Sequence, residues 1–255
     1  MRRIVIANQK GGVAKTTTAV NLATGLSRVG KQTLLIDVDP QANATFAVLG
    51  QEPDTDSTYD LIIRDAPLSQ VIRRTQQPNL DIVASNIDLA GAEIELISKV
   101  GGQTRLRTKI NEEADNLPYD FIIIDAPPSL GFLTINALAA SEEVLIPVPS
   151  SVFALNGIQR LEETIKLVRR DLGCPNLRVS GVVCTMVENT NVAKDVRSEI
   201  DGHFGALVFR TTIPKTVKVE ESHSRNQSIF EYAPGSSAAE AYQQLVQEVI
   251  NREHH

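Results

Sequence analysis

The residues with the clearest chemical potential lie in segment 8–17, NQKGGVAKTT, where two lysines bracket a glycine pair. An apolar run at 4–7 precedes this segment, and a helical pattern of apolar residues follows it. This is the strand–loop–helix context that a phosphate-binding loop requires. Backbone amides of such a loop close around phosphate oxygens, and the helix directs its positive dipole end at them. We therefore expect nucleotide phosphates to be bound by Gly11, Gly12, Val13, Ala14, Lys15, Thr16 and Thr17.

The two lysines have different expected roles. Lys15 is placed to reach the β- and γ-phosphates, and the Thr16 hydroxyl is placed to bind Mg²⁺. Lys10 is not needed by an ordinary phosphate loop, and within one chain it would point past the nucleotide that its own loop holds. A flexible glycine-rich turn beside two solvated lysines is the alternative, but the flanking patterns argue against it.

Three aspartates follow apolar runs that read as buried strands. Asp37 and Asp39 bracket the end of one run, and Asp125 ends the run FIIID. Because α/β sheets bind ligands at the carboxyl ends of their strands, all three acids are expected near the phosphates. We expect Asp37 and Asp125 to support Mg²⁺ and Asp39 to orient the attacking water at the γ-phosphate. Each acid alone is equally consistent with a helix cap or a loop carboxylate.

Apolar runs alternate with helical patterns along the whole chain, as in βαβ units. The pattern predicts an α/β fold with a doubly wound, mostly parallel sheet and helices on both faces. Strands are expected at 3–8, 33–37, 80–84, 121–125, 144–148, 179–185 and 208–213. Helices are expected at 16–29, as a pair within 60–74, and at 91–100, 104–116, 133–140, 154–171, 192–204 and 237–252.

Composition narrows the class of protein. The chain has 255 residues, of which 42% are hydrophobic, and shows no composition break, so we expect one domain over 1–253. His254 and His255 resemble the remnant of an affinity tag. Cys174 and Cys184 match no zinc spacing, and neither a signal peptide nor an apolar run of about 20 residues is present, so a cytoplasmic location is expected. A net charge of -6 argues against a protein whose whole surface binds nucleic acid.

Three motifs together resemble those of the ParA/Soj family of deviant-Walker partition ATPases. They are KGGVxKTT, IDxDPQxN and YDxIIIDxPPSLG, and shorter matches continue to Tyr242, so the resemblance covers nearly the whole chain. It implies ATP and Mg²⁺ as cofactors and an ATP-dependent sandwich homodimer. In such a dimer Lys10 would cross to the partner's nucleotide and act as a trans lysine, by the logic of an arginine finger. The resemblance also implies a base pocket at Met186, Pro214 and Val217.

The chain departs from the family pattern in three places. Ala14 stands where the family usually has glycine, so a positive φ there would cost about 1–2 kcal/mol. Segment 149–151 reads PSS in place of the usual QxE, which puts a polar contact near the dimer interface in doubt. Segment 187–191 is one residue shorter than usual and lacks an arginine that many relatives use to contact DNA.

The family resemblance further implies non-specific binding of double-stranded DNA by the ATP dimer, a ParB-type activator and a nucleoid-associated location. Dimerisation would double any basic patch, and only a few cations are needed to bind phosphates. The alternative is that these cations are solvated charges among neighbouring acids. The candidate DNA-binding residues are Lys194, Arg197, Lys215, Lys218 and Arg225.

Three other functions occur on the same fold. A ParA-like ATPase that positions a carboxysome or a chemotaxis cluster stays open, because a partner sets the cargo. A MinD-like membrane-cycling ATPase would need a basic amphipathic helix at the C-terminus. The stripe Ala238, Ala241, Tyr242, Leu245 and Val249 predicts core packing instead, so no stable membrane association is expected. An iron-protein reductase would need cysteines at cluster-bridging positions, which the sequence lacks.

Overall fold

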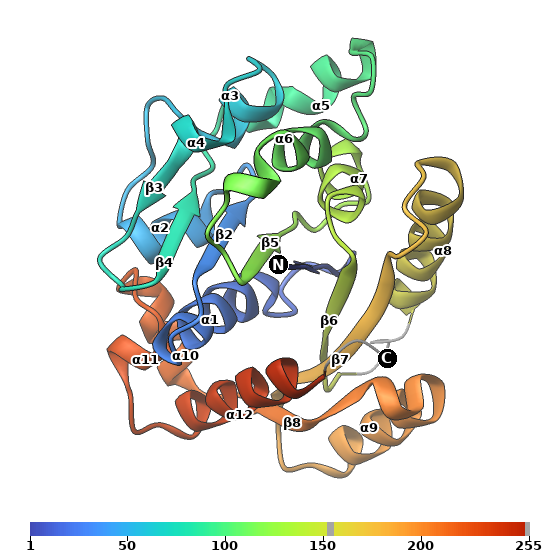
Figure 1. The fold of residues 1–255 in the computed structure, drawn as a ribbon. Coiled ribbons are helices and arrows are strands. Elements are labelled where there is room, and N and C mark those ends of the chain that lie inside the picture. Colours follow the sequence, from blue (N-terminus) through green and yellow to red (C-terminus); the bar gives the residue numbers. More distant parts are fainter. Residues whose placement is uncertain (152–155, 253–255) are drawn as a thin grey trace.

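One mixed sheet forms the centre of the molecule (Figure 1). The computed structural model describes residues 1–151 and 156–252. The strands are β1 (Arg2–Ile6), β2 (Thr33–Asp37), β3 (Ile72–Arg74), β4 (Leu80–Val83), β5 (Phe121–Asp125), β6 (Glu143–Pro149), β7 (Arg178–Val187) and β8 (Val208–Pro214). Their order is β3-β4-β2-β5-β1-β6-β7-β8, and every pair is parallel except β3 with β4. The predicted mostly parallel α/β fold is confirmed.

Helices cover both faces of the sheet. One apolar core lies under α3 to α9, and a second lies under α1, α2, α11 and α12. In Figure 1, α1 and α12 lie side by side on one face, and α6 and α7 lie on the other. The helices are α1 (Lys15–Arg28), α2 (Asn43–Leu49), α3 (Thr58–Ile62), α4 (Leu68–Val71), α5 (Leu89–Ser98), α6 (Arg105–Glu113), α7 (Phe132–Ala139), α8 (Asn156–Asp171), α9 (Asn191–Phe204), α10 (Val217–Ser224), α11 (Ile229–Tyr232) and α12 (Ser237–Asn251).

Burial on both faces explains why the central strands read as continuous apolar runs. In β2, Leu34 and Ile36 belong to one core, whereas Leu35 belongs to the other. The same alternation places Ile122 and Ile123 of β5 in different cores. A polar residue inside these strands would lie in one of the two cores, so the polar chemistry is confined to the strand ends and the loops that follow them.

Several short elements differ from the sequence prediction. Segment 60–74, expected to hold a pair of helices, contains most of α3, all of α4 and then the antiparallel edge strand β3. Three strand residues are too few to show a two-residue period, so the prediction there was wrong in part. Helices α2, α10 and α11 were not predicted, since four to eight residues give little helical periodicity. The expected helix at 154–171 is α8, and its first two expected residues lie outside the described residues, as do residues 254–255.

Candidate nucleotide-binding site

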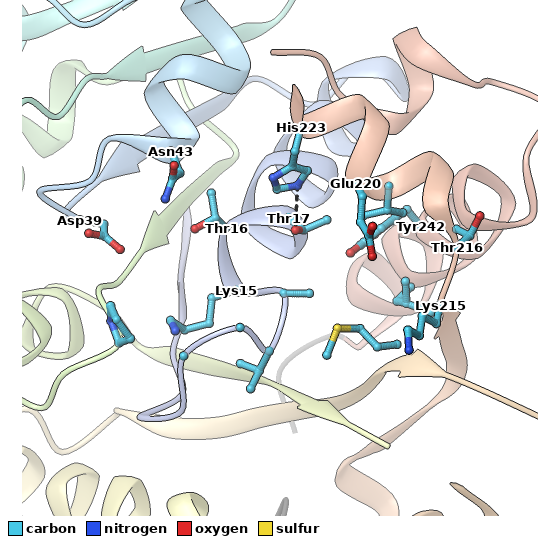
Figure 2. A pocket seen from close by; sticks show the side chains of 18 of the residues that line it. Lys15, Thr16, Thr17, Asp39, Asn43, Lys215, Thr216, Glu220, His223 and Tyr242 are labelled. Carbon is cyan, nitrogen blue, oxygen red and sulfur yellow. Dashed lines mark hydrogen bonds between the residues drawn. The ribbon is translucent and has the colours of Figure 1, made fainter. Parts of the chain in front are cut away.

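A cavity of about 580 Å³ opens at the carboxyl ends of β1, β2, β5, β7 and β8. Its walls come from the loop after β1 with the start of α1, from the loops after β2 and β5, and from α10 (Figure 2). The topology therefore brings together loops that are far apart in sequence, at the edge where parallel sheets bind ligands. The predicted site residues that line it are Gly11, Gly12, Val13, Ala14, Lys15, Thr16, Thr17, Asp39, Met186, Pro214 and Lys215.

The phosphate loop is held in a left-handed conformation at two positions. Gly12 has φ 69°, and Ala14, which precedes α1, has φ 65° and ψ 35°. The positive φ anticipated for Ala14 is present, and its Cβ makes this conformation cost about 1–2 kcal/mol relative to glycine. The loop is fastened to β7, because the Thr185 hydroxyl donates to the Val13 carbonyl over 3.1 Å. The strain is thus maintained by packing against the sheet.

Lys15 is buried within this loop. Its Nζ donates a hydrogen bond to the carbonyl of Lys10 over 3.2 Å, which closes the loop on itself. Burial lowers the pKa of Lys15, and the charges of Asp125 and Asp39 oppose that shift. Phosphate oxygens entering the cavity would therefore meet a lysine that is partly desolvated and already faced by two acids.

Lys10 differs from Lys15 in its placement. Its side chain is exposed, and it is not among the residues that line the cavity. Its backbone is nevertheless fixed, since the Lys10 amide donates to Asn8 Oδ1 over 3.0 Å and Asn8 Nδ2 donates to the Pro147 carbonyl over 2.8 Å. The backbone of Lys10 is therefore fixed at the start of the phosphate loop, while its side chain is exposed to solvent.

Asp37, at the end of β2, is fully buried and does not line the cavity. Its Oδ1 accepts a hydrogen bond from the Asp39 amide (3.1 Å), and its Oδ2 accepts from the Thr45 amide (2.9 Å) and hydroxyl (2.7 Å). Burial raises the pKa of Asp37 to about 7, although the Thr45 hydrogen bonds oppose the shift. The geometry makes Asp37 an anchor for the loop that carries Asp39.

Asp125 lies directly across from Asp37, because β2 and β5 pair these two residues in register. It is fully buried, and within the described residues neither of its carboxylate oxygens has a hydrogen-bond partner. Burial raises the pKa of Asp125 well above its usual range, Asp37 adds to this rise, and the Thr16 hydroxyl opposes it. The charge of Lys15 compensates the Asp125 carboxylate only in part, and a buried carboxylate is costly unless a proton or a cation accompanies it.

The donor set fits Mg²⁺ only together with a nucleotide. In the described part of the chain, no group of three or more His, Cys, Asp or Glu side chains is arranged to hold a metal by itself. Mg²⁺ commonly uses one or two carboxylates plus substrate phosphates and water. The orphaned Asp125 carboxylate, with Thr16 nearby on the cavity wall, provides the protein's share of such a site.

Asp39 lines the cavity on the side away from the predicted base pocket. It is 7% exposed, and its Oδ1 accepts from the Gln41 amide over 2.9 Å, while its carbonyl accepts from the Ser85 hydroxyl over 2.7 Å. Figure 2 shows Asp39 and Lys15 on one side of the cavity and Thr216 and Lys215 on the other. These contacts hold the Asp39 loop while its carboxylate remains at the cavity wall.

Two of the three residues predicted to form the base pocket lie at the cavity. Met186 and Pro214 line the cavity, but Val217 does not and is 63% exposed. Val219, two residues further along α10, lies on the cavity wall instead, because the helical turn carries Val217 outward. Met186 has a positive φ of 50°, and its carbonyl accepts a hydrogen bond from the Ser150 hydroxyl over 3.0 Å.

Several lining residues were not among the predicted site residues, although Gln41, Asn43, Pro128 and Tyr242 lie within the matched motifs. The others are Ile213 at the end of β8, Thr216 before α10, and Val219, Glu220 and His223 on α10, a helix that was not predicted. The Nε2 atom of His223 lies 2.8 Å from Thr17 Oγ1. His223 could have been identified only by knowing that α10 lies beside α1, which the periodicity of the sequence does not reveal. The missed residues are Gln41, Asn43, Pro128, Ile213, Thr216, Val219, Glu220, His223 and Tyr242.

The candidate DNA-binding residues are dispersed, and most are paired with acids. Arg197 pairs with Asp201, Lys215 with Glu188 and Lys218 with Glu221, at 2.8–2.9 Å. Lys194 is exposed on α9 with no ion pair among the described residues. Arg225 lines a separate polar cavity beside α2 and the loop before β4. The pairs of Lys215 and Lys218 are exposed and therefore weak, whereas Arg197 is partly buried and also donates to the Phe209 carbonyl over 3.1 Å.

The C-terminal helix packs as predicted. All five residues of its apolar stripe are buried, from Ala238 to Val249, and they belong to the core shared with α1. Throughout the two described ranges, every helix is too short or too polar to span a bilayer. Cys174 and Cys184 are both buried free thiols, and burial raises the pKa of each.

Comparisons with known proteins agree with this geometry. A family model described as an AAA domain matches residues 1–179. The sporulation initiation inhibitor protein Soj of Bacillus subtilis is 43% identical over 248 residues, covering 96% of this chain and 97% of Soj. The chromosome partitioning protein ParA of Caulobacter vibrioides is 40% identical, covering 99% of this chain and 95% of that protein. Cobyrinic acid a,c-diamide synthase from Mycobacterium smegmatis, solved with a bound ATP analog and magnesium, is 31% identical with a TM-score of 0.84, covering 98% of this chain and 95% of that chain.

Proposed function

Because this chain belongs to the Soj/ParA family of chromosome-partitioning ATPases, we propose that it binds ATP with Mg²⁺ and hydrolyses it as a homodimer. The observation that carries this is that the phosphate loop, Lys15 and Asp39 surround one cavity, while Lys10 is exposed and does not line it. The 31% identity to the diamide synthase is lower than the 40–43% identity to partition proteins, which favours partition.

Within one protomer, the loop amides and Lys15 bind the phosphates. Thr16 and Asp125 would hold Mg²⁺, and the carboxylate of Asp37, paired in register with Asp125, would add negative charge near the metal. The metal would neutralise charge on the β- and γ-phosphates. Asp39 orients the attacking water and accepts its proton. The buried position of these groups keeps bulk water from weakening their electrostatic interactions.

The second protomer would supply Lys10. A lysine fixed at its backbone, exposed at its side chain and outside its own cavity suits a role in trans. Its ammonium would stabilise charge that develops on the transferring phosphoryl group, as an arginine finger does. Hydrolysis would then require dimerisation, and dimerisation would require ATP.

The dimer would bind double-stranded DNA without sequence preference through Lys194, Arg197, Lys215, Lys218 and Arg225. It would move on the nucleoid and respond to a ParB-type activator that stimulates its slow turnover. Two observations support this proposal. One of the relatives is named a chromosome partitioning protein, and the five basic residues all lie in the C-terminal part of the sequence, between residues 194 and 225. A carboxysome or chemotaxis cargo is the alternative, set by a different partner. The buried stripe of α12 counts against a MinD-like membrane cycle.

Substitution of Lys10 by alanine tests the trans role. We expect Lys10→Ala to reduce ATP hydrolysis by about 10³-fold, because the phosphoryl group loses its stabilising cation. ATP binding by the monomer should stay within about threefold of the parent, since Lys10 does not line its own cavity. Lys31→Ala is the matched control, because Lys31 precedes the amino end of β2 and the cavity lies at the carboxyl ends of the strands. Parental turnover in Lys10→Ala would refute the role.

A further inference from the structure

His223 is a polar side chain of the nucleotide cavity to which no role has been given. It lies near the end of α10, and its ring projects toward α1 across the cavity wall (Figure 2). Its Nε2 atom makes a 2.8 Å hydrogen bond with Thr17 Oγ1, and among the described residues this is the hydrogen bond that the ring makes. The second ring nitrogen is therefore available to another partner.

The position of His223 in the cavity indicates which part of a bound nucleotide it would contact. Figure 2 shows Thr17 between Lys15 on one side of the cavity and Thr216 on the other. Met186 and Pro214 form the base end of the same cavity. His223 therefore faces the region between them, where a nucleotide carries its first phosphate.

We propose that His223 binds the α-phosphate of ATP and ADP together with Thr17, and that it takes up a proton when the nucleotide binds. The inference rests on the proposed binding of ATP in this cavity. Without nucleotide, the neutral ring shares a hydrogen bond with the Thr17 hydroxyl. With nucleotide, the imidazolium donates to a phosphate oxygen, which supplies the negative charge that the free site lacks.

The electrostatic surroundings support this exchange. The ring is largely buried, and that burial lowers the pKa of His223 in the free protein. A phosphate beside the ring would raise that pKa again, because an opposite charge stabilises the protonated form. The extra affinity is then present at low pH and is lost as the pH rises through the pKa of the bound state. The charged or titratable groups on the same cavity are Lys15 on α1, Asp39 after β2, Lys215 after β8, Glu220 on α10 and Tyr242 on α12.

Calorimetric titration of ATP and ADP with Mg²⁺ tests the proposal across about pH 6 to 8.5. The proteins compared are the parent, His223→Gln and His203→Gln. Glutamine keeps a hydrogen bond to Thr17 but takes up no proton. His203 is the matched control, because it lies on α9 and bonds Glu162, away from the cavity. Ionisation of the nucleotide itself is common to all three proteins, so only the difference between them is informative.

Near pH 6 we expect the parent to bind both nucleotides about three- to tenfold more tightly than His223→Gln, and near pH 8.5 to match it within about twofold. ATP and ADP should show the same difference, since both carry an α-phosphate, and His203→Gln should follow the parent. Parallel pH profiles for the parent and His223→Gln would overturn the role of His223 alone. A parent protein that binds neither nucleotide would overturn the proposed function as well.

Discussion

The phosphate end and the base end of the cavity are built by different means. At the phosphate end, strand register sets Asp37 opposite Asp125, and two left-handed residues shape the loop. At the predicted base end, near Met186 and Pro214, part of the wall is the eight-residue helix α10, whose Glu220 lines the cavity while Lys218 pairs with Glu221. The first region is determined by the topology of the sheet, and the second by side chains on a short surface helix.

This difference predicts how substitutions act. Asp125 is buried with no partner for its oxygens among the described residues, so its charge strongly affects both the stability of the protein and its ligands. The ion pair of Lys218 with Glu221 has partners that are 48% and 44% exposed, so its loss changes stability little. Substitutions at the phosphate end should therefore produce large effects on catalysis, and those at the α10 end smaller effects on binding.

The largest effect is expected at Asp39. Asp39→Ala should reduce hydrolysis by about 10²- to 10⁴-fold, because the attacking water loses its base. ATP binding should persist, so the dimer should accumulate with ATP and Mg²⁺. Size-exclusion chromatography with light scattering would detect it, and a variant that stays monomeric with ATP would refute the assignment.

Asp125→Asn should reduce magnesium-dependent turnover and also change the pH dependence of folding. Burial raises the pKa of Asp37 to about 7 and raises that of Asp125 further than its neighbours lower it. The folded protein therefore holds protons that the unfolded chain releases. The contribution of these bound protons to the free energy of unfolding is fully present below about pH 4 and is lost as the pH rises through about 7.

Urea unfolding without Mg²⁺ at about pH 5 and pH 8 measures this effect. The free energy of unfolding of the parent should fall between the two pH values. In Asp125→Asn this fall should be smaller by about 1–2 kcal/mol, because one member of the buried pair no longer ionises. Asp54→Asn, at an exposed position, should behave as the parent. An equal fall in all three proteins would contradict the buried pair as its source.

A smaller effect is expected on the α10 side. Lys218→Glu should weaken ATP-dependent binding of any duplex DNA by about tenfold and reduce the salt dependence of that binding. The fluorescence anisotropy of two unrelated duplexes, measured over a range of salt concentrations, would show this. Lys31→Glu, at the amino edge of the sheet, is the charge-matched control. Loss of binding to only one of the duplexes would argue against non-specific DNA binding.

The smallest effect is expected at Ala14. Ala14→Gly relieves a left-handed alanine but makes the unfolded chain more flexible, so the net change in stability is within about 1 kcal/mol. Nucleotide affinity or turnover should increase by about two- to fivefold as the loop amides gain freedom. Unchanged binding and turnover would show that the loop accommodates alanine without functional cost.

The placement of the residues at the predicted phosphate end could be predicted from the sequence because each part there has a local signature. Segment 8–17 follows an apolar strand and opens a helix, and Asp37 and Asp125 each end an apolar run. The base end was predicted less completely. Whether Val217 or Val219 faces the cavity depends on how α10 is rotated, and the contact of His223 with Thr17 joins residues 206 positions apart. Neither is encoded in a local period or motif.

A mixing experiment tests the trans action of Lys10 most directly. Lys10→Ala and Asp39→Ala proteins, each inactive alone, are combined without nucleotide, and hydrolysis is measured after ATP and Mg²⁺ are added. In a mixed dimer the Lys10→Ala protomer retains Asp39 and receives the intact lysine of its partner. Random pairing should therefore restore roughly a quarter of the parental rate, since half of the dimers are mixed and each has one complete site. A mixture as inactive as its components would show that Lys10 does not act across a dimer.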